Sequence, residues 1–146
     1  MRRPRRPRAH QFRPADSAQQ IVGGFLLAGP FVVTEEVWRL AESMNVLQWV
    51  LTVGVVFAIG YGALYKADSK RDSEAEQEMG GVPIRFISLM VVSYGAVAIL
   101  AVIFDAPGTF LSHLESTREV VFVTIRAVSV GAVFAVVGAA TADSVF

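Results

Sequence analysis

The sequence predicts an all-α fold, a polytopic bundle of about four transmembrane helices with both termini on the cytoplasmic side. Of the 146 residues, 53% are hydrophobic and only 18% are charged, below the roughly 25% of an average soluble domain. The hydrophobic residues gather in four blocks, each close to the roughly 20 residues that a helix needs to cross the hydrocarbon layer. The predicted helices cover about residues 19–40, 46–65, 83–104 and 120–141.

The second block separates a membrane helix from a soluble one most clearly. A helix on the surface of a soluble protein shows polar residues every three or four positions. Residues 47–64 carry no charge, and their polar residues are only Gln48, Thr52 and Tyr61. No face is left for water. The blocks also lack the alternating pattern of a transmembrane β-barrel.

The first 17 residues form a basic tail that we expect to be disordered at the cytoplasmic lipid surface. A cleavable signal peptide is the first alternative, but the acidic segment 34–38 does not suit a peptidase. A nucleic-acid arm is the second, but the tail has one aromatic residue, Phe12, and no folded module behind it. We therefore expect residues 18–146 to form one multi-pass domain of the cell membrane, with no nucleic acid as partner.

The orientation follows from the basic residues, because the side with more lysine and arginine normally stays in the cytoplasm. The loop at about 67–81 is expected to be cytoplasmic and solvated, without chemistry of its own. The basic residues of the predicted inner side are Arg2, Arg3, Arg5, Arg6, Arg8, Arg13, Lys66, Lys70, Arg71 and Arg85, against Arg39 and Arg118 on the outer side.

The sequence gives little support for an enzyme. It has no cysteine and two histidines, so we expect no thiolate catalysis, no iron–sulfur cluster and no metal site. Neither a phosphate-binding glycine loop nor a Gly-x-Ser-x-Gly elbow is present. We expect no catalytic residues and no cofactor.

The fourth block carries a charge inside the membrane. Arg126 lies about six residues inside this block, where a charged side chain is costly and usually faces a partner or a water-filled cavity. One hypothesis is that it pairs with Glu35 or Glu36, which lie at a similar expected depth, and locks the first helix against the fourth. Two alternatives stay open: the arginine stem reaches the outer interface alone, or the three charges bind or move an ion or proton.

Glycine and proline predict features of single helices. Gly29 and Pro30 make the first helix a candidate for a kinked or broken helix. Small residues four apart allow helices to pack closely, and they occur on the second and fourth helices. These packing candidates are Gly54, Gly62, Gly131, Ala135 and Gly138.

Further polar residues lie near the ends or within the apolar blocks. The hydroxyls of Ser88 and Ser93 can bond to helix carbonyls or cross to a neighbouring helix. Asp143, at the inner end of the fourth block, is expected at the membrane interface.

Three segments carry a resemblance to a known family: Ala-Gln-Gln at 18–20, Phe-Val-Val-Thr-Glu-Glu-Val-Trp at 31–38 and Gly-Ala-Ala-Thr-Ala-Asp-Ser at 138–144. In these the chain resembles an uncharacterised group of small haloarchaeal and bacterial integral membrane proteins, over most of its length beyond the tail. The resemblance implies a membrane location and no activity. Eleven arginines against two lysines, and the acidic loop, fit a halophile.

Three classes of function stay open. The leading one is a structural or accessory role in the lipid bilayer. The alternative is an ion or proton channel or transporter that uses Glu35, Glu36 and Arg126. Because four short helices enclose little space, such a unit would have to be a homo-oligomer. A membrane-embedded enzyme is disfavoured, since adjacent carboxylates on a helix point about 100° apart. The sequence names no substrate.

Overall fold

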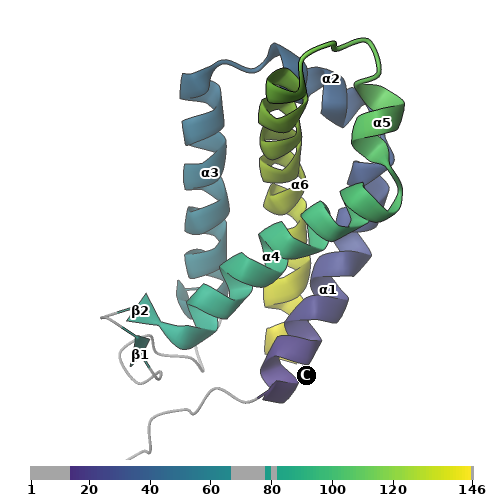
Figure 1. Ribbon diagram of the computed structural model, residues 1–146. Coiled ribbons are helices and arrows are strands. Elements are labelled where there is room, and N and C mark those ends of the chain that lie inside the picture. Colours follow the sequence, from purple (N-terminus) through teal and green to yellow (C-terminus); the bar gives the residue numbers. More distant parts are fainter. Residues whose placement is uncertain (1–13, 67–77, 80–81, 146) are drawn as a thin grey trace, which may run out of the picture.

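The computed structural model describes residues 14–66, 78–79 and 82–145, and these form a helical bundle (Figure 1). Most of the predicted tail and of the predicted loop at 67–81 lies outside the described residues. The elements are α1 (Pro14–Val32), α2 (Glu35–Ser43), α3 (Val46–Tyr61), the π-helix η1 (Gly62–Lys66), the antiparallel strands β1 (Glu78–Met79) and β2 (Val82–Pro83), α4 (Ile84–Ile103), α5 (Ala106–Phe110) and α6 (Thr117–Val145).

The predicted transmembrane helical bundle is confirmed. Three helical stretches are each long and apolar enough to cross a membrane, namely Val46–Leu64, Ile84–Ile103 and Thr117–Asp143. A fourth crossing is present if α1 and α2 are taken as one span. The start of α1 and the end of α6 lie at the same end of the bundle (Figure 1), as an even number of crossings requires.

The first predicted helix, at about 19–40, is wrong as a single element. It consists of α1 and α2, which are bent by 80° at a break that includes Thr34. Thr34 Oγ1 donates a hydrogen bond to the carbonyl of Pro30 at 2.6 Å, and Trp38 Nε1 donates to the carbonyl of Val32 at 2.9 Å. These bonds satisfy carbonyls that the interrupted helix leaves free. The break therefore follows Pro30 within one turn, while Pro30 itself and Gly29 lie inside α1.

Helix α2 buries one side and exposes the other. Trp38 and Ala41 are buried, and the indole of Trp38 stacks on Phe110 of α5 with ring centroids 6.0 Å apart. Glu36 and Arg39 are exposed. Helix α2 therefore covers the end of the bundle opposite to the two termini.

Helix α6 is the centre of the bundle and contacts α1, α2, α3 and α4. Its small residues lie against neighbours. A Cβ atom on Gly131 would come within 2.8 Å of Val97, and Ala135 is fully buried. A Cβ atom on Gly138 would collide with the backbone carbonyl of Gly23, and the reverse holds for Gly23. The backbones of α1 and α6 therefore touch at this point.

Helix α3 lies at the edge of the bundle. Gly54 and Gly62 face open space, whereas a Cβ atom on Gly60 would come within 2.5 Å of Met90. The contact face of α3 is therefore the one that carries Gly60. Its outer face exposes large apolar side chains such as Leu47 and Leu51, which suits lipid.

Helices α3 and α4 meet at one end and diverge toward the other. Near the start of α4, the ring of Phe86 lies 5.9 Å from that of Phe57 and 6.0 Å from that of Tyr61. From there α4 runs obliquely away toward α1 and α5, with α6 behind the gap (Figure 1). An open hollow lies between α4 and α6, lined among others by Gly95 and Ala98 of α4 and by Thr124 and Val128 of α6.

The contact between α1 and α6 predicts unequal effects of one substitution at two glycines of α1. Gly23→Ala should lower the stability by about 1–3 kcal/mol. The new methyl group would collide with the backbone carbonyl of Gly138, which cannot move away as a flexible side chain could. Gly29→Ala is the matched control, since a Cβ atom there has no atom within 4 Å. The measurement is thermal unfolding in detergent. Equal melting temperatures for the two variants would contradict the contact.

The orientation can be tested by cysteine labelling, because the chain has no cysteine. His113 Nε2 lies 2.7 Å from Glu42 Oε1, so the connection before α6 lies at the same end as Ser43. We expect Ser43→Cys and His113→Cys to react with an impermeant maleimide outside intact cells, because the basic residues place this end outside. Ser144→Cys should react only after permeabilisation. The reverse pattern would invert the orientation.

Candidate functional site

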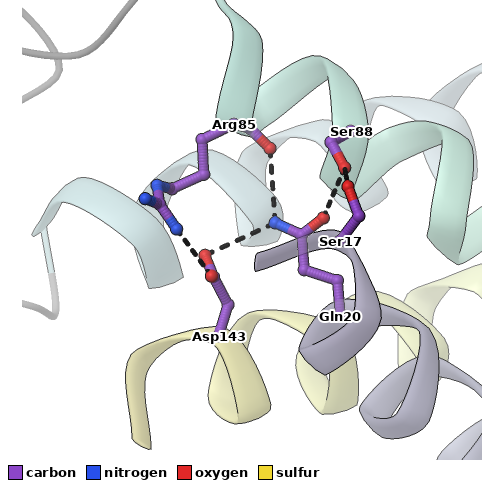
Figure 2. A network of polar contacts seen from close by, with 5 residues as sticks. All are labelled: Ser17, Gln20, Arg85, Ser88 and Asp143. Carbon is purple, nitrogen blue, oxygen red and sulfur yellow. Dashed lines mark hydrogen bonds and ion pairs between the residues drawn. The ribbon is translucent and has the colours of Figure 1, made fainter. Parts of the chain in front are cut away.

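A cluster of polar side chains joins α1, α4 and α6 at the end of the bundle where α1 and α4 begin and α6 ends (Figure 2). Helix α1 contributes Ser17 and Gln20, α4 contributes Arg85 and Ser88, and α6 contributes Asp143. We call these five residues the buried cluster. It brings together positions that lie up to 126 residues apart, 17 and 143.

The helical repeat and one backbone contact align the cluster. Ser17 and Gln20 are three residues apart, a spacing that places both on one face of α1, and Arg85 and Ser88 share that spacing in the first turns of α4. Gly23 lies about one turn after Gln20. Because Gly23 touches the backbone of α6, Gln20 is brought beside the last turns of α6, where Asp143 lies.

An ion pair forms the centre of the cluster. Arg85 Nη1 lies 2.6 Å from Asp143 Oδ1, and the side chains are 8% and 0% exposed. Gln20 Nε2 lies 3.4 Å from Asp143 Oδ2 and 3.4 Å from the carbonyl of Arg85, and donates to both. Gln20 Oε1 accepts from Ser88 Oγ at 2.7 Å, and the hydroxyls of Ser88 and Ser17 are 3.1 Å apart. Both carboxylate oxygens of Asp143 are thus engaged.

Each charge of the pair lies at the unfavourable end of its own helix. A helix carries partial positive charge at its N-terminus and partial negative charge at its C-terminus. Arg85 is in the first turn of α4, and Asp143 is near the end of α6. The ion pair places the guanidinium beside the end of α6 and the carboxylate beside the start of α4. The two helix ends therefore favour the pair and disfavour either charge alone.

The side chain of Asp143, which was expected at the membrane interface, is fully buried within the protein. Arg85, counted among the basic residues of the inner side, is also buried. Neither residue was predicted as a site residue from the sequence, and Gln20 was not predicted either. Gln20, Arg85 and Asp143 are polar residues at the ends of apolar blocks. This pattern alone does not identify a site, because residues at the membrane interface occur at the same positions.

The charges singled out from the sequence lie elsewhere. Glu35 Oε1 pairs with Arg39 Nη2 at 2.9 Å on the exposed side of α2, and Glu36 is exposed. Arg126 is half-buried and lines a small cavity with Val46 and Trp49 of α3. Within the described residues, no ion pair joins Arg126 to either glutamate.

Other hydroxyls within the membrane helices bond to carbonyls of their own helix, which is common for serine and threonine. Ser93 Oγ donates to the carbonyl of Leu89 at 2.6 Å, and Ser129 Oγ donates to that of Ile125 at 3.0 Å. Ser129 Oγ also accepts from Trp49 Nε1 at 3.0 Å, which ties α3 to α6. The described residues contain no group of three acidic, histidine or cysteine side chains that could hold a metal ion.

Comparison with known proteins gives one match. Residues 3–145 match the model of a family described as "Putative integral membrane protein (DUF2391)". No curated protein and no solved structure matches the chain. The match covers nearly the whole sequence, so it confirms the resemblance to an uncharacterised family of membrane proteins.

The buried ion pair predicts a large difference between two equivalent substitutions. Asp143→Asn should destabilise the protein by about 3–5 kcal/mol, because it removes one member of a buried ion pair, the carboxylate that binds Arg85 and Gln20. Glu35→Gln removes the carboxylate of the exposed pair with Arg39 and should cost at most about 1 kcal/mol. Both changes replace a carboxylate by an amide of the same shape. The measurement is the thermal unfolding of each variant in the same detergent.

A double variant separates the loss of the charge partner from a loss of packing. Combining Arg85→Met with Asp143→Asn should recover part of the stability, since the guanidinium charge is removed together with the carboxylate charge. Equal stability of Asp143→Asn and Glu35→Gln would instead mean that the buried pair contributes no more than the exposed one.

Proposed function

The chain belongs to this family of integral membrane proteins, and from that premise we propose a structural or accessory role in the membrane, without ion conduction or catalysis. The observation that carries the proposal is the filling of the bundle. Most of the described core is made of apolar side chains in two clusters, one around Trp38 and Val97 and the other around Leu89 and Val136. Such side chains offer an ion no oxygen ligands in place of its water shell, and the buried hydroxyls of Ser93 and Ser129 donate to helix carbonyls.

The buried cluster supports the same role. A group that binds and releases an ion or proton needs a lone pair or a donor that is free in one state. Here the carboxylate oxygens of Asp143 bind Arg85 and Gln20, and the amide oxygen of Gln20 binds Ser88. These bonds fix α1, α4 and α6 relative to one another. The cluster is thus suited to holding helices together.

The placement of the three charges first considered for transport also favours the accessory role. Glu35 and Glu36 lie on α2, across the end of the bundle, and Arg126 lies on the side of α6 that faces α3. The small cavity that Arg126 lines includes neither glutamate. A transport path that uses them would have to form between copies in a homo-oligomer, and the flux experiment below tests that alternative directly.

Flux in liposomes distinguishes the two functions. We expect no flux of protons, Na⁺ or K⁺ above that of empty liposomes, because the described bundle offers no hydrated path. An added ionophore shows that the vesicles hold a gradient. Arg126→Leu and the double variant Glu35→Gln with Glu36→Gln are measured beside the unmodified chain. Flux that is present in the unmodified chain and lost in these variants, with folding retained, would establish a conductor.

A further inference from the structure

One face of α6 carries two arginines with an aromatic ring between them. Arg118, Phe122 and Arg126 are four residues apart, so they follow one another along the same face. The guanidinium of Arg118 lies 5.5 Å from the ring centroid of Phe122, a cation–π distance. Arg118 is exposed and Arg126 is half-buried. This face therefore presents positive charge at two depths, about 12 Å apart along the helix axis.

Two hollows lie on this side of α6, one lined also by residues of α3 and the other also by residues of α4. A small cavity of about 80 Å³ is lined by Val46, Trp49, Phe122, Ile125 and Arg126. A wider, open groove of about 460 Å³ is lined by Tyr94, Gly95, Ala98, Thr124, Ile125 and Val128. Ile125 lines both, so the two hollows are neighbours along α6. Together they form an apolar groove with a cation near one end.

Arg126 lacks an anion inside the protein. Within the described residues it makes neither an ion pair nor a side-chain hydrogen bond. Glu35 and Glu42, which lie at this end of the bundle, pair with other residues, Glu35 with Arg39 and Glu42 with His113. A charged side chain in a membrane helix is costly without a partner. The charge thus calls for an anion supplied from outside the chain.

We propose that this groove binds one anionic phospholipid from the leaflet at this end of the bundle. The phosphate pairs with the guanidinium of Arg126, whose planar fork matches two phosphate oxygens. One acyl chain lies in the open groove along Ile125 and Val128. Arg126 is close in space to Val46, the first residue of α3, so its long stem can reach the phosphate level. Arg118, nearer the membrane surface, adds to the attraction for an anionic headgroup.

The groove favours a phospholipid over a second copy of the chain. A lipid supplies an anion and an apolar chain in one molecule, and these match the cation and the apolar hollow. The proposal does not depend on the accessory role, because a conducting protein could bind the same lipid. Loss of lipid binding and appearance of ion flux are therefore separate results.

The test is native mass spectrometry of the full chain in detergent, with phosphatidylglycerol or phosphatidylcholine added. We expect one phosphatidylglycerol to be retained in preference to phosphatidylcholine. Arg126→Leu should lower the affinity for phosphatidylglycerol about tenfold, which corresponds to about 1.4 kcal/mol. Arg39→Leu is the matched control, because Arg39 lies at the same end of the bundle but pairs with Glu35, and it should bind as the unmodified chain does.

A second variant tests the groove without touching the charge. Gly95 lines the groove, and a Cβ atom there has no atom within 4 Å. Gly95→Leu should fill the hollow, improve the helix and lower the retention of both lipids while the melting temperature is kept. Equal retention by Arg126→Leu and the unmodified chain would overturn the proposal. A dimer without bound lipid would overturn it too, in favour of a second copy as occupant.

Discussion

The ion pair between Arg85 and Asp143 is the interaction on which one end of the bundle depends. Neither charge could be buried alone, since each lies at the unfavourable end of its own helix and out of water. The pair therefore requires the start of α4 to lie beside the end of α6. Gln20 extends the requirement to α1, because its amide binds Asp143 and the backbone of Arg85. The contact of Gly23 with Gly138, one turn along α1, makes that position reachable.

The two ends of the bundle satisfy their polar groups in different ways. At the end with Asp143, charges from two helices meet and are sealed from solvent. At the other end, Glu35 and Arg39 pair on an exposed surface, where an ion pair contributes little. Between them the two core clusters of the described residues are apolar. A molecule whose buried ion pair is fixed at one end is better suited to holding position in a membrane than to moving ions through it.

The helices that the sequence predicted correctly are those with long uninterrupted apolar runs. Lipid offers no hydrogen-bond partners, so the backbone of such a run must bond within itself, as it does in a helix. The site was harder to predict. Arg85 and Asp143 are 58 residues apart, and nothing in either segment says that they meet. The packing role of the glycines of α3 and η1 was equally hard to predict from the sequence. Periodicity picks out Gly54 and Gly62 as readily as Gly60, and only the position of α4 and α6 shows that Gly60 makes the contact.

The break after α1 decides where the remaining charges lie. A straight helix through residue 40 would carry Glu35 and Glu36 along the same axis as the apolar residues before them. The bend of 80° instead turns α2 across the end of the bundle, with Trp38 held by the carbonyl of Val32. Glu35 pairs with Arg39 one turn later on the exposed side of α2. Among the described residues, Arg126 on α6 makes no ion pair with either glutamate of α2.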